Sequence, residues 1–205
     1  EREHRRRRTS LNERFGTART EGLFMSSRDG QCFRRWREAF IRPGPQQTGN
    51  WTYGDNYQNW GLVETASAVG GAPDELSIYV SEHYWRNPGA VTRRYSLRLD
   101  GFVSVNSPMT GGELLTRPFT FAGDQLVLNV STSAAGSVRV EVRDVEGDAI
   151  PGFALDDCVD IFGDAIDLPV RWTGDSDLGK LAGRPVRLRF VMQDADLFSM
   201  RFRQG

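Results

Sequence analysis

The chain consists mostly of short segments in which apolar and polar residues alternate, separated by turn-forming residues roughly every 8–12 positions. Residues 75–82 and 138–143 show the alternation most clearly, with an apolar side chain at every second position. A repeat of two residues places one face of an extended strand against a core and leaves the other face in water. Because no segment has the periodicity of a helix, we predict an all-β fold.

The first block of strands extends over residues 21–99, and we predict that it is partial β-propeller blade material. The expected strands are residues 22–26, 33–40, 60–65, 75–82 and 93–99. The Asp29-Gly30 pair between the first two is a strong signal for a β-hairpin, because glycine accepts the positive φ that tight hairpin turns require. One propeller blade and part of a second require this many short strands, joined by turns, within about 80 residues.

The second block extends over residues 100–205, and a length of 205 residues leaves room for two small domains. Strands are expected at residues 102–105, 114–121, 125–130, 138–142, 168–172, 186–192 and 197–202. Many short strands with frequent turns and no helical segment are typical of an antiparallel β-sandwich. We therefore predict a β-sandwich domain at residues 100–205, with the boundary near Asp100-Gly101.

Residues 1–20 form a basic N-terminal arm that contains seven arginines and three glutamates. Clustered arginine, as in Arg5 to Arg8, is a common electrostatic signature of nucleic-acid binding. However, Glu1 and Glu3 lie beside the cluster, and the formal charge of the whole chain is −1. We favour a solvated arm and expect no nucleic-acid partner. No run of about 18 apolar residues is present, so a membrane-spanning helix is not expected either.

Aromatic and polar side chains are concentrated between positions 51 and 64. Flat aromatic faces stack on sugar rings, and neighbouring polar groups can hydrogen-bond sugar hydroxyls. The aromatic residues could instead fill the space between neighbouring sheets. The candidate saccharide-binding residues are Trp51, Tyr53, Asn56, Tyr57 and Trp60.

Two carboxylates in the same segment, Asp55 and Glu64, are the candidate catalytic residues. Glycoside hydrolysis requires two carboxyl groups about 5.5 Å apart for retention of configuration and about 6.5–9.5 Å apart for inversion. Glu64 lies within an apolar run, where a buried carboxylate is costly unless it has a partner or a function. For Asp55 the competing and favoured interpretation is that its side chain caps a turn.

Other motifs do not indicate a metal or a cofactor. His4 and His83 are too isolated for a zinc site, and Cys32 and Cys158 lack ligand spacing. The acidic residues between positions 156 and 167 lack the spacing of a calcium-binding loop, so a solvated loop is favoured. We therefore expect neither a bound metal nor a cofactor.

Three segments resemble five-bladed β-propeller glycoside hydrolases of families 32 and 43. Residues 27–44 are similar to a blade hairpin, and residues 51–65 continue that likeness. Residues 93–104 resemble the passage from the last blade into a C-terminal β-sandwich. The resemblance implies a carbohydrate-active parent protein whose active site consists of three carboxylates facing a central channel.

The resemblance also implies that part of the parent protein is missing from this chain. Five blades cannot be built from about 100 residues, and the first blade, which carries the nucleophile in these families, has no counterpart here. Residue 1 is glutamate and not an initiator methionine, so we expect a processed chain or a piece of a longer one. The expected partners are a saccharide and the missing N-terminal blades, and the chain alone is expected to be inactive. The alternative is a non-catalytic carbohydrate-binding or structural β-sandwich module.

Overall fold

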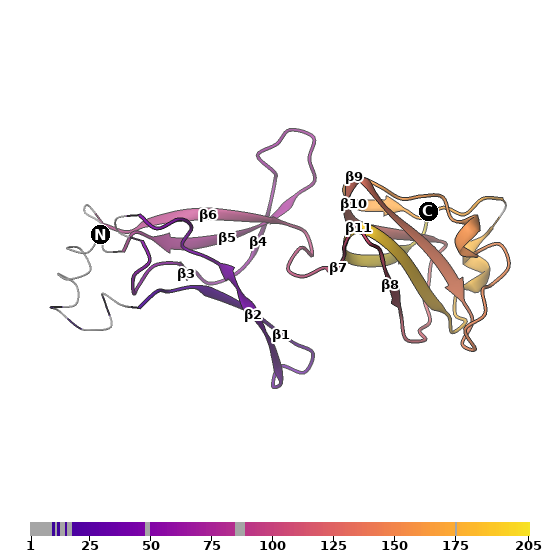
Figure 1. Ribbon diagram of the computed structural model, residues 1–205, viewed down its shortest axis with the longest axis horizontal. Coiled ribbons are helices and arrows are strands. Elements are labelled where there is room, and N and C mark those ends of the chain that lie inside the picture. The colour runs from indigo at the N-terminus through magenta and orange to yellow at the C-terminus, as the bar shows by residue number, and fades with distance from the viewer. Residues whose placement is uncertain are drawn as a thin grey trace. The chain divides into compact units, whose positions relative to one another are not determined.

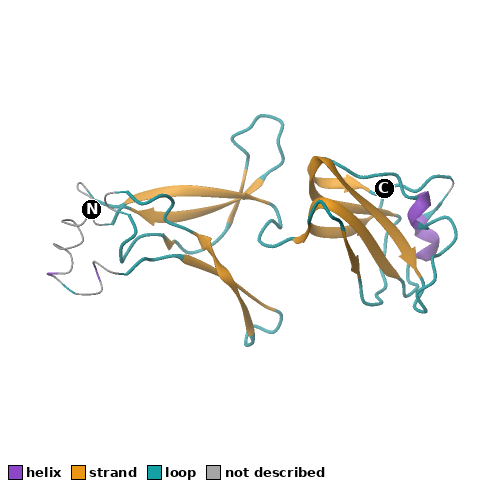
Figure 2. Ribbon diagram, in the orientation of Figure 1, coloured by secondary structure: helices purple, strands orange, loops and turns teal. Residues whose placement is uncertain are grey.

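The computed structural model describes residues 10, 12, 15, 18–47, 50–84, 89–174 and 176–205. All strand pairs within these residues are antiparallel, so the predicted all-β antiparallel class is confirmed (Figures 1 and 2). The chain divides into two compact units, Glu1–Arg98 and Leu99–Gly205. The arginine cluster at positions 5–8 lies outside the described residues. None of the described helices is long and apolar enough to cross a membrane.

The N-terminal unit begins with the predicted hairpin, formed by β1 (Gly22–Ser27) and β2 (Phe33–Ile41). Gly30 in its turn has a φ of 72°. The Asp29 carboxylate accepts hydrogen bonds from the backbone amides of Cys32 at 2.7 Å and Gln31 at 2.9 Å. These two bonds, with a third from the Ser27 hydroxyl, lower the pKa of Asp29 to about 2. The local Asp-Gly signal therefore predicted this turn correctly.

A four-stranded sheet completes the N-terminal unit around its central strand, β5 (Glu75–Glu82). The strand β6 (Val91–Arg98) pairs with β5 along its whole length. The other edge of β5 is shared by two short strands, β3 (Tyr57–Gln58) and β4 (Val63–Thr65). Because successive side chains point to opposite faces of a strand, Ile78 and Val80 of β5 lie on the same face.

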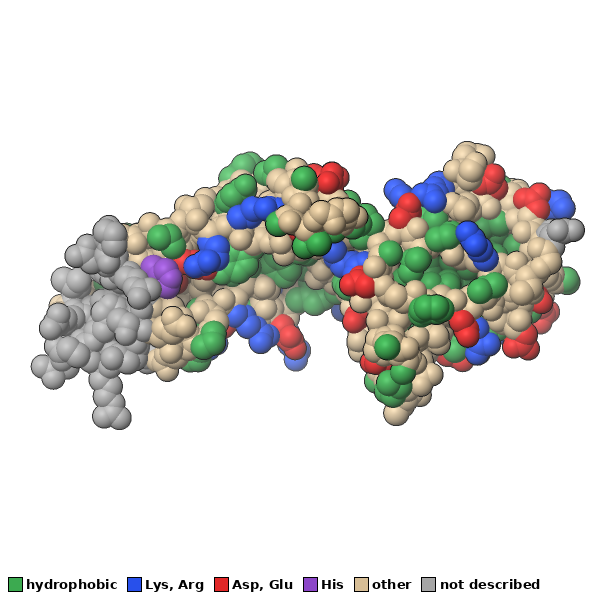
Figure 3. All heavy atoms as spheres, turned by 90° about the horizontal axis from the view of Figure 1, so that it is seen from above, with side chains coloured by type: hydrophobic (Ala, Val, Ile, Leu, Met, Phe, Trp, Pro, Cys, Tyr) green, Lys and Arg blue, Asp and Glu red, His purple; other side chains and the backbone are tan. Residues whose placement is uncertain are grey.

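Few side chains form the core of this unit. Among the described residues, the buried cluster consists of Ile41, Ile78 and Val80, with Tyr95 and Leu97 packed against it. Several large apolar side chains remain exposed, and hydrophobic surface is visible in Figure 3. They include Leu23, Met25, Phe33, Leu62 and Val63. The unit therefore buries little of its apolar surface within itself.

The C-terminal unit is built on two long strands, β9 (Gln125–Arg143) and β11 (Arg187–Arg203), which pair along nearly their full lengths. The strand β10 (Asp164–Pro169) lies on the outer edge of β9. Two short strands, β7 (Val105–Ser107) and β8 (Gly112–Leu115), pair with β11. The five strands form one hydrogen-bonded sheet that curls into a half-barrel (Figure 1). Two short 3₁₀ helices, η1 (Leu155–Asp157) and η2 (Leu178–Leu181), complete it.

The strand boundaries in this unit differ from the prediction. The segments expected at 125–130 and 138–142 are one continuous strand, and so are those expected at 186–192 and 197–202. In β9 the residues at positions 131–137 are small or polar, so the apolar alternation stops there and the sequence predicts two strands instead of one. In β11 a bulge between Gln193 and Ala195 shifts the apolar residues from even to odd positions.

The C-terminal core is extensive in comparison with that of the N-terminal unit. Alternate side chains of β9 and β11 are fully buried, including Leu128 and Val140 on one strand and Leu188 and Phe190 on the other. Leu178 and Leu181 of η2 also belong to this cluster. This unit therefore has a core of its own.

Candidate functional site

The candidate site lies in the N-terminal unit, where the loop between β2 and β3 is held by a buried asparagine. The Asn50 side-chain amide nitrogen donates to the carbonyl oxygens of Pro43 at 2.9 Å and Pro45 at 2.7 Å. Its side-chain oxygen accepts a hydrogen bond of 2.7 Å from the Gln47 amide. Because both amide protons and the oxygen are used, Asn50 fixes the backbone of the loop residues that precede it.

The end of this loop is fastened to the adjacent β5 strand. Asp55 is 2% exposed, and its Oδ1 accepts a hydrogen bond of 2.9 Å from the backbone amide of Tyr84. The Asn56 backbone amide donates to the Ser81 carbonyl at 2.8 Å, and its side chain donates to the Thr20 carbonyl at 3.0 Å. Asp55 and Asn56 therefore have structural contacts, and the contact of Asp55 is a long-range one to Tyr84, not a cap on its own turn.

The structure does not bring the two candidate catalytic carboxylates together. Asn56 lies beside Ser81, whereas Glu64 of β4 is paired with Leu76. Ser81 and Leu76 are five residue steps apart along the extended strand, which corresponds to about 16 Å between their backbones. That exceeds the separation of about 5.5–9.5 Å that glycoside hydrolysis uses. Glu64 is also exposed, so the argument that burial gives it a special role does not apply.

The aromatic residues that were predicted to bind a saccharide do not share one environment. Tyr53 stacks on Phe15 with ring centroids 5.1 Å apart and meets Tyr57 edge-on at 6.4 Å. Trp60 is fully exposed. The Trp51 indole nitrogen donates to the Gly44 carbonyl at 2.7 Å, so that the ring is held against the loop. Tyr53 and Tyr57 form an aromatic cluster, and Trp51 contributes to a pocket.

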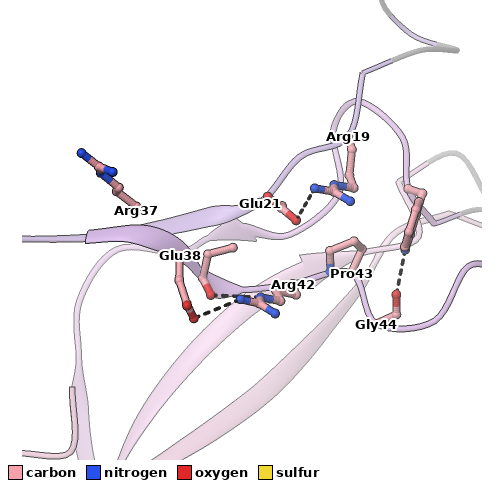
Figure 4. Close-up of a pocket in the computed structure, with 9 residues that line it drawn as sticks. Arg19, Glu21, Arg37, Glu38, Arg42, Pro43 and Gly44 are labelled. Carbon is pink, nitrogen blue, oxygen red and sulfur yellow. Dashed lines mark hydrogen bonds and ion pairs between the residues drawn. The ribbon is translucent and has the colours of Figure 1, made fainter. Parts of the chain in front are cut away.

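The Trp51 pocket has a volume of about 440 Å³ and lies between this loop and the β1–β2 hairpin (Figure 4). Two ion pairs line it. Arg19 contacts Glu21 at 2.9 Å, and Arg42 contacts Glu38 at 3.4 Å. The Arg19 guanidinium also lies 5.0 Å from the centre of the Trp51 ring. The pocket combines an aromatic side chain with charged groups that can donate and accept hydrogen bonds.

A second pocket, the His83 pocket, has a volume of about 200 Å³ and shares Pro43 with the first. Asn50, Asp55 and Asn56 contribute to its wall. Glu82 at the end of β5, His83 immediately after it and Arg93 on β6 also line the pocket. It is therefore lined mainly by polar residues.

The Glu82 carboxylate is the most constrained group in the His83 pocket. Burial favours its neutral form, but hydrogen bonds from the Tyr95 hydroxyl and from Arg93 at 2.7 Å outweigh burial and lower the pKa of Glu82. Burial and the hydrogen bond to Glu82 raise the pKa of Tyr95 to about 12. Glu82 is therefore a fixed anion over a wide pH range, and its Oε2 lies 4.0 Å from His83 Nε2.

Sequence reasoning missed most of the residues that line the two pockets. In the sequence, His83 lacked the neighbours of a zinc site or of a catalytic triad, and no cluster that could hold a metal occurs among the described residues. A signal was present for Glu82, because the alternation of β5 ends there with a carboxylate on the same face as Ile78 and Val80. Arg19 and Glu38 gave no signal, because these residues, 19 positions apart in sequence, line one pocket only once β1 and β2 have paired.

Comparisons with protein-family models, with curated protein sequences and with solved structures found no match to this chain. The assignment of a function therefore depends on the geometry of the two pockets and on the resemblance noted in the sequence.

Proposed function

We propose that this chain is the C-terminal part of a five-bladed β-propeller glycoside hydrolase-like protein and that its N-terminal unit binds a saccharide. The observation that carries the proposal is the Trp51 pocket, in which an aromatic residue predicted to bind sugar lines a cavity beside two ion pairs. The C-terminal unit, whose five described strands form one half-barrel sheet, then takes the place of the accessory β-sandwich of such a protein.

The incomplete core of the N-terminal unit supports its assignment as blade material. A two-stranded hairpin is marginal in water unless it packs against something, and β1–β2 exposes Leu23, Met25 and Phe33. In a propeller, neighbouring blades cover such faces and leave only short edges open. We propose that the missing N-terminal blades are the partner that covers this surface.

The chemistry of the Trp51 pocket supports a saccharide ligand. An indole ring offers a flat apolar face for the C–H groups of a sugar, and the bond from the indole nitrogen to the Gly44 carbonyl holds the ring in place. The carboxylates of Glu21 and Glu38 accept hydrogen bonds from hydroxyl groups, and the guanidinium groups of Arg19 and Arg42 donate them. The volume of about 440 Å³ lies within the range of about 300–1,000 Å³ that is usual for small-molecule sites.

The proposal does not include catalysis by this chain alone. Asp55 is buried and hydrogen-bonded, Glu64 is exposed, and the two are too far apart to act on one glycosidic bond. This separation also favours the second candidate, a non-catalytic carbohydrate-binding module. Both candidates predict binding, and they differ in whether a longer parent protein hydrolyses the bound sugar.

Isothermal titration calorimetry with three neutral trisaccharides, xylotriose, arabinotriose and 1-kestose, tests the proposal. We expect the full chain to bind at least one of them and Trp51→Ala to weaken that binding about tenfold, because aromatic contacts contribute about 1 kcal/mol beyond their buried area. Trp172→Ala in the C-terminal unit is the matched control and should leave affinity unchanged. An absence of binding to all three, or equal affinity in Trp51→Ala, would contradict the proposal.

A further inference from the structure

His83 has an unusual backbone conformation immediately after β5. Its φ of 58° lies in the left-handed region, which a residue with a Cβ atom rarely adopts. Two residues of the neighbouring loop, Trp51 and Asn56, share this conformation, with φ values of 56° and 60°. Backbone strain of this kind concentrates at ligand-binding and active sites, where the surrounding contacts maintain it. Here all three residues line one of the two pockets.

The His83 ring has an unsatisfied polar atom. Its Nδ1 is buried and has no hydrogen-bond partner among the described residues. A buried polar atom without a partner is unfavourable, and in native proteins such an atom usually hydrogen-bonds to a water molecule or a ligand. The other ring nitrogen, Nε2, lies 4.0 Å from the Glu82 carboxylate. One ring nitrogen of His83 therefore faces the Glu82 carboxylate, and the other has no hydrogen-bond partner among the described residues.

Glu82 provides a hydrogen-bond acceptor that is already oriented. One carboxylate oxygen accepts from the Tyr95 hydroxyl and the other from Arg93 Nε at 2.7 Å. Each carboxylate oxygen has two acceptor positions, so capacity remains for a ligand hydroxyl. On the loop side, Asn50 has its amide fully committed to holding Pro43 and Pro45. The wall of the pocket is thus formed before any ligand arrives.

The size and charge of the pocket restrict the ligand. A volume of about 200 Å³ is below the range of about 300–1,000 Å³ for drug-sized ligands and suits one small ring. Among the described residues, its lining includes the carboxylates of Asp55 and Glu82 and one guanidinium, that of Arg93, which is already paired with Glu82. An acidic ligand would place its negative charge next to these two carboxylates, which is unfavourable.

We infer that the His83 pocket is a subsite for one neutral sugar unit, with Glu82 and the Nδ1 atom of His83 hydrogen-bonded to its hydroxyl groups. The inference rests on the proposed saccharide-binding function and adds to it a second subsite and a preference for uncharged sugars. Because Pro43 lines both pockets, the two subsites lie beside the same loop. Glu82 and His83 act here as binding residues.

The variants His83→Gly and Glu82→Gln test this inference in the full chain. Glycine accepts a positive φ, so His83→Gly removes the ring without adding backbone strain. We expect each variant to weaken binding of the neutral trisaccharide about tenfold in calorimetric titration, while the Tm of His83→Gly stays equal to or above that of the wild type. Glu64→Gln, at an exposed position on β4, is the matched control and should bind normally. Trigalacturonate, the acidic probe, should bind at least tenfold more weakly than the neutral sugar.

The possible failures are distinguishable. Wild-type affinity in both His83→Gly and Glu82→Gln, with binding lost in Trp51→Ala, would overturn the second subsite and leave the proposed function intact. Weaker binding in His83→Gly alone, accompanied by a lower Tm, would assign His83 a structural role and also overturn the inference. Equal affinity for trigalacturonate would overturn the preference for neutral sugars. If no probe binds the wild type, both the inference and the proposed function fail.

Discussion

At the scale of single residues, Trp172 connects parts of the C-terminal core that are distant in sequence. Its ring meets Phe153 edge-on with centroids 5.2 Å apart, and its indole nitrogen donates to the Val140 carbonyl at 2.9 Å. Its backbone also forms an isolated bridge with Cys158. The Trp172 side chain, from the segment after β10, thus contacts both β9 and the irregular segment between β9 and η1, and its backbone pairs with the residue that follows η1.

We therefore expect Trp172→Ala to reduce the free energy of unfolding by about 3 kcal/mol, through loss of packing and of the hydrogen bond. Trp172→Phe should have a smaller effect, about 1–2 kcal/mol, because it keeps an aromatic ring but leaves the Val140 carbonyl without its donor. Urea denaturation followed by circular dichroism measures both. A loss below about 0.5 kcal/mol in Trp172→Ala, the usual range of surface substitutions, would show that the contacts of Trp172 are not important for stability.

At the scale of elements, the long β9–β11 pair depends on a local irregularity. Between the paired positions on either side, residues 133–136 of β9 lie opposite Asp194 alone, which has a φ of 43°. Gly136 lies at this point, and a Cβ atom added to it would be 2.4 Å from the Asp194 carbonyl oxygen. The backbones can therefore approach closely here only because position 136 has no side chain.

Gly136→Ala should destabilise the protein by about 1–3 kcal/mol, because the backbone of β11 would have to move away. The matched control is Gly70→Ala. An added Cβ at Gly70 meets no atom within 4 Å, and its φ is not positive. Thermal melts of the two variants measure the difference in Tm, which should fall for Gly136→Ala and stay near the wild-type value for Gly70→Ala. Equal Tm values in both variants would be inconsistent with a close backbone approach at Gly136.

The elements also show which features could be predicted from the sequence. The β1–β2 hairpin was predictable because Asp29 and Gly30 determine its turn locally. The continuity of β9 could not be predicted, because its middle residues lack the apolar alternation of a strand. They are extended because they belong to a strand that pairs with β11. The same reasoning applies to the site. Trp51 could be selected by residue type, whereas the proximity of His83 to Asn56 depends on how a loop folds against the end of β5.

At the scale of the whole molecule, the two units differ in how much apolar surface they bury. In the described part of the chain, the N-terminal cluster has three buried residues and the C-terminal cluster eighteen. Burial of apolar surface is the main favourable contribution to folding, so local stability should be low in the first unit and high in the second. The proposal that the first unit consists of blade material requires this difference, since blades depend on their neighbours.

Native-state hydrogen exchange on the 205-residue chain tests this claim most directly. We expect the slowest amide exchange in β9 and β11, limited by global unfolding, and exchange at least about tenfold faster in β1 and β2. The backbone hydrogen bonds of the hairpin are intact in the structure, so its faster exchange would report weak packing. Equal protection in β1–β2 and β9–β11 would contradict the account, because it would show that the N-terminal unit is as stable as the C-terminal unit without neighbouring blades.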